Sequence, residues 1–197
     1  MSRIYRYVVR VDAGTAPRPH GGVCSLAICK PRIRATAEVG DWVIGFRSRE
    51  PGQVIYAMKV TERLTLGEYW LDPRFEDRKP GASSSPDNFY RPGRGKLVQV
   101  PNHIHTPAGY DRDTGGRNVL LSTHFWYFGA DSKPIPKNLH HLIYQGRGHV
   151  LRDTRPGDED RLEKWLSKWD GGKLGDPIKP PDDPPGCEPQ PATRARC

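Results

Sequence analysis

Two apolar runs separated by a polar loop constrain the fold of this chain more than any other feature. The runs occupy residues 39–60, and the loop between them, residues 47–53, contains a Pro-Gly pair. Runs rich in Val, Ile, Trp, Phe and Tyr around such a loop predict a β-hairpin. Because side chains alternate between the faces of a strand, Trp42 and Phe46 share one face of the first strand, and Tyr56 lies on an apolar face of the second. These apolar and aromatic strand faces must pack against something apolar or flat, either a protein core or a nucleobase.

Further alternating segments indicate a mostly β structure with one clear helix. With 197 residues, 35% of them hydrophobic, and with 21 Gly and 20 Pro, the chain fits one domain that has a modest core and many loops. The helix is predicted to begin near Asp158 and to end at Gly171, with Leu162 and Trp165 on its apolar stripe. Additional strands are predicted over residues 4–11, 24–29, 98–105, 118–128 and 143–150, and a single helical turn over residues 32–37. We therefore expect an α+β fold in which a curved mixed β-sheet carries one amphipathic C-terminal helix.

The chain divides into a folded part and a tail. Residues 1–172 carry the apolar patterns, whereas residues 173–197 are rich in proline and show no apolar period, which predicts a Pro-rich disordered tail. Residues 61–99 also lack a clear period, but they contain five aromatic side chains. We expect a functional loop or a docked lid in that middle segment.

Positive charge is concentrated in the folded part. The formal net charge is +8, and the four cationic and four acidic residues of the tail cancel. A positive electrostatic field of this kind favours the binding of a polyanion or a phosphate-bearing ligand, although many basic proteins bind neither.

The composition also suggests the cellular setting. No segment approaches the roughly 20 consecutive apolar residues of a membrane span, and the N-terminus lacks the pattern of a cleaved leader. The four cysteines have neither zinc-site spacing nor the density of a disulfide scaffold, so we expect free thiols. These observations predict a cytoplasmic protein with no membrane partner.

Several short sequence motifs, separated along the chain, form a distinctive set. They are DAGTAP (residues 12–17), GVCSLAICKPRIR (22–34), GDW (40–42), IYAMKV (55–60), DNFY (87–90), LLS (120–122) and GRGH (146–149). In these motifs the chain resembles the nucleotide modification associated domain 2 family, from about the first strand to residue 150. The resemblance implies an accessory of bacterial and phage systems that make, read or process modified bases, and it implies no particular reaction.

The predicted hairpin is similar to a known barrel element as well. A Gly40-Asp41 pair that enters a strand ending in an aromatic, followed by an Ile-Tyr strand, looks like the central hairpin of PUA-like barrels, including the EVE and YTH types. This likeness implies a PUA-like β-barrel as the alternative to an open curved sheet. It also implies a flipped or modified base in an aromatic pocket.

Base recognition requires aromatic faces, donors and acceptors for the base edge, and cations at the phosphate. The candidates for base binding are Trp42, Phe46, Tyr56, Asp12, Asn88, Tyr90 and Ser122. The candidates for phosphate binding are Arg10, Lys30, Arg32, Arg34 and Arg147. The competing interpretation is that the aromatics belong to a core, that the arginines form a solvated edge, and that the 87–90 segment is a turn pinned by its aromatics.

A hypothesis from another class makes the protein an enzyme of transferase or hydrolase type that acts on a modified nucleotide. His149 or His105 would then work with Asp12 or Asp113 in general acid–base chemistry. Nucleophilic catalysis through Cys24 is less plausible, because that residue lies in an apolar strand pattern.

Metal binding is the remaining chemical alternative. His103 and His105 share a predicted strand face and could chelate an ion with Asp111 or Asp113. No HExxH, CxxC or HxE pattern supports such a site, so we expect neither a metal nor another cofactor.

The function predicted from the sequence is recognition of a modified base or nucleotide, as an accessory of a nucleic-acid modification or restriction system. The expected partners are nucleic acid or nucleotide and proteins of such a system. The enzyme described above and a protein-interaction accessory are the alternatives.

Overall fold

Two open β-sheets and a separate hairpin form the body of the protein. The structure, a computed structural model, describes residues 2–179. The strands are β1 (Ile4–Val9), β2 (Arg18–His20), β3 (Val23–Leu26), β4 (Trp42–Arg47), β5 (Gln53–Lys59), β6 (Glu62–Thr65), β7 (Tyr90–Pro92), β8 (Leu97–Gln99), β9 (Asn118–Ser122), β10 (His124–Tyr127), β11 (Lys133–Pro134), β12 (His149–Val150) and β13 (Gly172–Lys173). The α-helices are α1 (Pro31–Thr36), α2 (Leu66–Leu71), α3 (Tyr110–Thr114) and α4 (Asp158–Leu166), and the 3-10 helices are η1 (Pro73–Arg78), η2 (Pro107–Gly109), η3 (Gly129–Asp131) and η4 (Lys137–Leu142).

The larger sheet is mixed and is built around the predicted hairpin. Its strand order is β12-β1-β4-β5-β10-β13, and β11 also pairs with β5. β4 and β5 are antiparallel neighbours joined by the polar loop, so the hairpin prediction is confirmed. β1 runs parallel to β4, and the chain between them makes β2, β3 and α1.

The smaller sheet continues from the larger one through a bend. Its order is β2-β3-β9-β6. The predicted strand over residues 118–128 is found as two strands, β9 and β10, which break at Thr123. At the break the Ser122 hydroxyl donates to the Lys59 carbonyl and accepts from the His124 N–H. Ser122 therefore stabilises the point where the chain passes from one sheet to the other.

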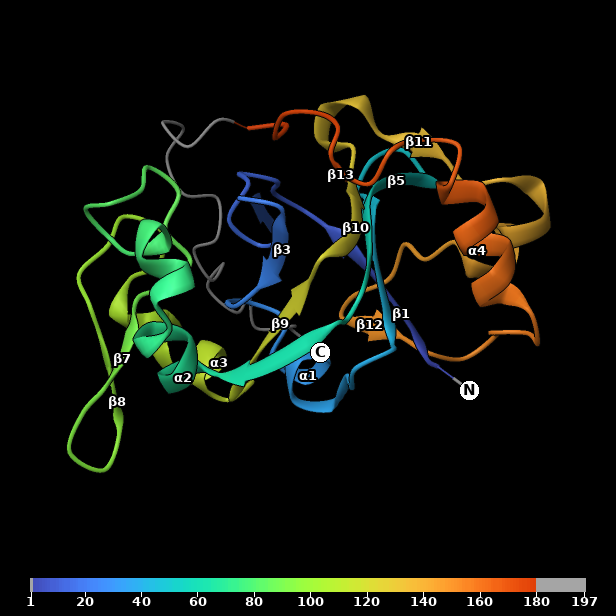
Figure 1. Ribbon diagram of the computed structural model, residues 1–197. Coiled ribbons are helices and arrows are strands. Elements are labelled where there is room, and N and C mark those ends of the chain that lie inside the picture. Colours follow the sequence, from blue (N-terminus) through green and yellow to red (C-terminus); the bar gives the residue numbers. More distant parts are fainter. Residues whose placement is uncertain (1, 180–197) are drawn as a thin grey trace, which may run out of the picture.

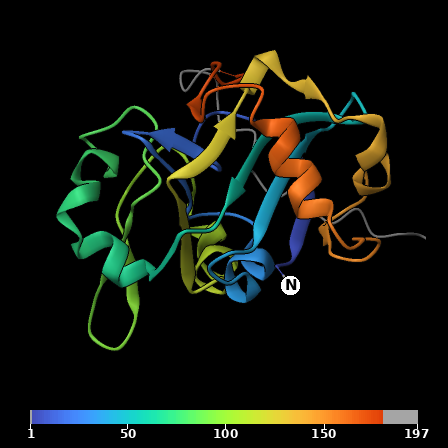
Figure 2. The ribbon, with the colours of Figure 1, turned by 45° about the vertical axis from the view of Figure 1, so that its right-hand side comes forward.

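Figure 1 shows the arrangement of the sheets and helices, and three apolar clusters lie between these layers. One lies between the larger sheet and α4 and contains Trp42 and Phe46. A second lies between the two sheets and α1 and contains Tyr56. A third lies between the smaller sheet and α2. Figure 2 shows α4 lying across the larger sheet, with α2 at the opposite end of the molecule.

The architecture is the α+β class with curved mixed sheets that the sequence predicts. Among the described residues the strands form open sheets and no closed barrel, so the curved sheet is observed rather than the barrel alternative. The predicted amphipathic helix begins at Asp158 and ends at Leu166, earlier than Gly171. No helix within residues 2–179 combines the length and the apolar character needed to cross a membrane.

The C-terminal segment passes along both sheets before the described residues end. Gly172 and Lys173 pair with β10, and the Lys179 N–H donates to the Asp12 carbonyl. The predicted Pro-rich tail, residues 173–197, begins within this segment, and its residues 180–197 lie outside the described residues.

Candidate active site

The turn between β3 and α1 places a cysteine in an unusual backbone conformation. β3 ends at Leu26, and Pro31 is the first residue of α1. In the turn between them, Cys29 has a φ of +58° and Lys30 a φ of +42°. Side chains with a Cβ are strained at such angles, and the strain persists only where surrounding contacts hold the backbone. This observation points to Cys29 as a residue whose position matters.

Cys29, His105 and Asp113 form a linear set that we call the Cys29 relay. The Cys29 Sγ lies 3.6 Å from Nε2 of His105. The other ring nitrogen, Nδ1, makes a short contact with Oδ2 of Asp113. His105 is 4% exposed and Asp113 is fully buried, so solvent does not compete for these contacts. A thiol, an imidazole and a carboxylate in this order can activate a nucleophile, because the carboxylate orients the ring and the ring accepts the thiol proton.

The Asp113 carboxylate is held in its ionised form. Its Oδ1 accepts a hydrogen bond from the Cys29 N–H, and its Oδ2 accepts one from the Tyr90 hydroxyl, both at 2.9 Å. Burial alone would raise the pKa of Asp113, but the hydrogen bond and charge of His105, with the Cys29 N–H and Arg112, lower it below its usual value. A lowered folded-state pKa adds stability above the unfolded value of about 4, and this stability is lost as the pH falls through the folded value.

Arg34 connects the backbone at Cys29 with the backbone at Asp113 from inside the protein. This side chain of α1 is fully buried. Its guanidinium donates to the carbonyls of Ala27, Cys29, Asp113 and Asn118. Burial lowers the pKa of Arg34 to about 10, and the charge of Asp113 opposes that shift. Arg34 and a Cys29 thiolate also attract each other electrostatically, so the buried cation favours the charged form of the nucleophile.

Two more cations lie beside the relay. Arg112 Nη2 is 3.5 Å from Nδ1 and 3.4 Å from Nε2 of His105, which places the guanidinium over the face of the ring. Lys30 follows Cys29 directly, and its Nζ lies 4.3 Å from the centre of the Tyr7 ring. The surroundings of the thiol are therefore positively charged and favour an anionic ligand.

The same three side chains could also hold a metal ion. One donor atom from each of Cys29, His105 and Asp113 lies within 4.8 Å of the others. A shared ion would need one ring nitrogen and one carboxylate oxygen turned toward the thiol. Instead the two ring nitrogens face different partners, Cys29 on one side and Asp113 on the other. This orientation fits a proton relay better than a common ion.

Replacing Tyr90 with phenylalanine is expected to lower the free energy of unfolding by about 1.5 to 3 kcal/mol, because a buried carboxylate loses a hydrogen bond. Chemical denaturation at pH 7 measures the change. Tyr144→Phe is the matched control, since its hydroxyl donates to the exposed Arg147 carbonyl. Equal losses in the two variants would contradict the role assigned to Tyr90.

The structure distributes the predicted base-binding aromatics over separate clusters. Trp42 and Phe46 are fully buried on the face of the larger sheet that meets α4. Tyr56 is fully buried on the opposite face, and its hydroxyl lies 2.8 Å from that of Tyr7. Tyr90 belongs to the third cluster and contacts the relay.

The predicted polar contacts to the base are mostly internal. Asp12 accepts a hydrogen bond from the Tyr127 hydroxyl at 2.7 Å, and burial raises the pKa of Asp12. The Asn88 amide donates to the carbonyls of Tyr69 and Phe75. Ser122 stabilises the bend between the sheets. These side chains do not converge with the aromatics on one site.

The predicted phosphate-binding cations differ in exposure, and Lys30 is partly buried. Arg34 is buried behind the relay, whereas Arg10, Arg32 and Arg147 are exposed. Lys30 and Arg32 lie close enough to His149 to act on it electrostatically. Burial lowers the pKa of His149, and the charges of these two residues lower it further.

Of the residues considered for catalysis, the structure brings together His105 and Asp113. His103 is exposed and contacts the Ser84 carbonyl instead, and Cys24 is fully buried in the cluster between the sheets. The sequence reasoning missed Cys29. The available signal was its place directly before Lys30-Pro31, because a proline at the start of a helix marks a strand-to-helix turn.

The fold and the site define an α+β protein with a buried imidazole–carboxylate pair facing a cysteine at a strained turn. The family model for nucleotide modification associated domain 2 matches residues 1–181. The chain therefore belongs to the nucleotide modification associated domain 2 family, which confirms the resemblance seen in the sequence. The comparisons with curated proteins and with solved structures gave no match. Family membership associates the protein with nucleotide modification.

Proposed function

We propose that the protein is a thiol-dependent enzyme of a nucleotide modification system, in which Cys29 attacks an acyl group carried by a modified nucleotide. The observation that carries this proposal is the relay geometry, with His105 between the thiol and a buried, ionised carboxylate. Recognition of a base uses stacking, edge contacts and phosphate contacts and does not involve a nucleophile. The geometry therefore favours the enzyme hypothesis over the recognition hypothesis.

The proposed reaction has two halves. In the first, His105 Nε2 accepts the thiol proton, the Cys29 sulfur adds to the carbonyl carbon, and the leaving group departs with that proton, which leaves a thioester. In the second, water or an acceptor group gives its proton to His105 and attacks the thioester, and the thiol is regenerated. Asp113 stabilises the imidazolium formed in each half. The overall result is hydrolysis or transfer of the acyl group.

Recognition of the modified base or nucleotide remains part of this proposal as the binding step. The cations beside the relay, Lys30 and Arg112, support a substrate that carries phosphate. Other proteins of a modification or restriction system are the partners that would supply the modified nucleotide.

Alkylation by iodoacetamide tests the relay without knowledge of the natural substrate. At pH 7 we expect Cys29 to be the first thiol modified, and we expect its rate to fall at least about tenfold in His105→Ala, because the thiolate loses its base. Peptide mass spectrometry measures the modification at each cysteine. Cys24→Ser is the control, since burial raises the pKa of that thiol and it should contribute nothing. An unchanged Cys29 rate in a folded His105→Ala protein refutes the proposal.

A further inference from the structure

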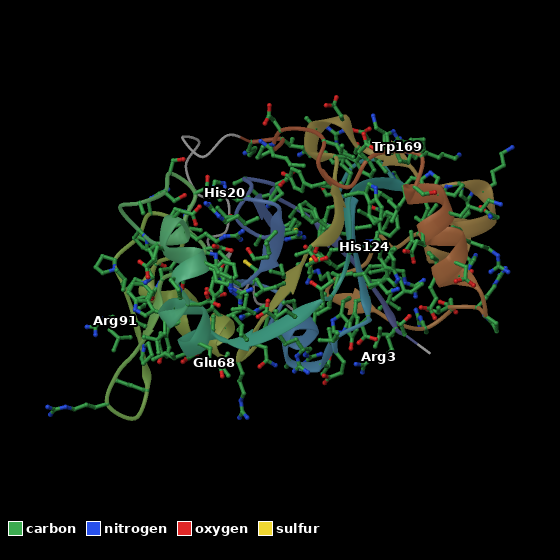
Figure 3. All side chains as sticks on the ribbon, in the orientation of Figure 1. Arg3, His20, Glu68, Arg91, His124 and Trp169 are labelled. Atoms are coloured by element: carbon green, nitrogen blue, oxygen red, sulfur yellow. The ribbon has the colours of Figure 1, made fainter. Side chains whose placement is uncertain are left out.

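A basic hairpin projects from the end of the molecule that carries α2 (Figure 1). We call it the basic arm and define it as residues 90–99, which comprise β7, a turn and β8. Tyr90 pairs with Gln99 at its base, and the Gly93 N–H donates to the Lys96 carbonyl across the turn. Residues 91–96 are all exposed. In Figure 3 the labelled Arg91 lies at this outer edge, far from Trp169 on the α4 side.

The arm carries three cations and no acid. Arg91, Arg94 and Lys96 occupy its outer half. Within residues 2–179, none of their side chains has a hydrogen bond or an ion pair. Arg74 shows the contrast, because its guanidinium is paired with Glu62 and Asp72. Three solvated charges on a projecting hairpin are available to an external anion.

The base of the arm is attached to the Cys29 relay. The Tyr90 hydroxyl donates to Asp113 at 2.9 Å. Its strand partner Gln99 donates its side-chain amide to the His105 carbonyl, also at 2.9 Å. The base of the arm therefore contacts two relay residues, His105 and Asp113, and its outer half extends into solvent.

The length of the arm matches a polymer rather than a single nucleotide. Three strand residues span about 10 Å at roughly 3.3 Å per residue. Phosphates of one strand in a duplex are about 3.4 Å apart along the axis, so an arm that lies along the axis covers about three of them. A mononucleotide at Cys29 would leave the outer cations without phosphate.

We propose that the basic arm binds the sugar-phosphate backbone of a nucleic acid strand and delivers a modified nucleotide of that strand to Cys29. This inference rests on the proposed function and adds that its substrate is polymeric. Phosphate contacts of this kind position a nucleic acid without reading its sequence. Deoxyribose and ribose polymers share the chemistry that the arm recognises.

The test compares the triple variant Arg91→Ala, Arg94→Ala, Lys96→Ala with a matched triple variant, Lys137→Ala, Lys164→Ala, Lys168→Ala. The control removes the same charge from exposed lysines on the other side of the molecule: Lys137 in η4, Lys164 in α4 and Lys168 just after α4. Fluorescence anisotropy measures the Kd of labelled 20-nucleotide single-stranded DNA, duplex DNA and RNA between 50 and 200 mM salt. We expect the arm variant to bind at least about tenfold more weakly at low salt, and its slope of log K against log salt to fall by about 2 for single strands. The control should bind like the unaltered protein.

Alkylation separates failure of this inference from failure of the proposed function. Bound oligonucleotide should protect Cys29 from iodoacetamide in the unaltered protein and in the control, and should not protect it in the arm variant. The alkylation rate without oligonucleotide should be equal in all three proteins. Equal binding by the arm variant and the unaltered protein, or equal weakening in both triple variants, overturns the inference while leaving the relay intact. A Cys29 that is unreactive in every protein instead overturns the proposed function.

Discussion

An Asp113→Asn protein is expected to lose about four orders of magnitude in the rate of the Cys29-dependent acyl transfer, the loss typical of a relay whose imidazole adopts the wrong tautomer. With its oxygen in the place of Oδ1, the asparagine can still accept from the Cys29 N–H, while its NH2 group takes the place of Oδ2 and the Tyr90 hydroxyl loses its acceptor. Its NH2 group then faces Nδ1 of His105. That nitrogen must become an acceptor, the ring proton moves to Nε2, and Nε2 can no longer accept the thiol proton.

Turnover of acylated nucleotides, or the rate of Cys29 acylation by an activated ester, measures this loss. Asp111→Asn is the matched control, because Asp111 is an exposed acid on the same short helix, α3. The Asp111→Asn protein should retain full activity. If Asp113→Asn reacts as fast as Asp111→Asn, the carboxylate has no role in activating the thiol.

The regular elements could be predicted because their signals are local. The hairpin of residues 39–60 follows from alternation, and the start of α4 follows from its acidic first turn and its apolar stripe. Alternation also places Trp42 and Phe46 on one face. Alternation does not predict which element covers that face. In the structure α4 and its neighbours cover it. The prediction of an aromatic pocket depended on that missing information.

The helix α2 was missed although its signal was present. Thr65 and Glu68 form a capping box, in which each side chain accepts a hydrogen bond from the other residue's N–H. This pattern is independent of apolar periodicity, which is absent in that part of the sequence.

The relay could not be predicted because it joins residues that no local pattern connects. Cys29 and His105 are 76 positions apart, and only the return of the chain past the β3–α1 turn brings them together. His105 and Asp113 were both considered for catalysis, but a nucleophile was sought at Cys24. Both cysteines follow apolar residues, and only the backbone shows that Cys24 is inside a strand and that Cys29 lies beyond it.

Arg34 shows a different limit of sequence reasoning. Counted with the basic residues around it, the side chain looks like part of a solvated phosphate-binding surface. In α1, however, Ile33 and Arg34 are the buried residues, and Arg32 is exposed. Gly116 makes room for the guanidinium, since a Cβ at that position would lie 2.6 Å from the Arg34 Cζ.

Replacing Arg34 with methionine is therefore expected to lower the free energy of unfolding by at least about 3 kcal/mol, because four carbonyls lose their donor and Asp113 loses a nearby buried cation. The reactivity of Cys29 should fall in the same variant, since Arg34 holds the Cys29 carbonyl and stabilises the thiolate. Denaturant titration measures the first effect, and iodoacetamide alkylation in the remaining folded protein measures the second.

Arg32→Met is the control for both measurements, because it makes the same chemical change two residues away on the exposed face of α1. We expect that variant to stay within about 0.5 kcal/mol of the unaltered protein, as is usual for exposed positions. A small loss in Arg34→Met, similar to that in Arg32→Met, would show that the carbonyls find other donors. In that case the strained turn at Cys29 must be held by its N–H bond to Asp113 and by the packing of α1, and Arg34 would not be the residue that positions the nucleophile.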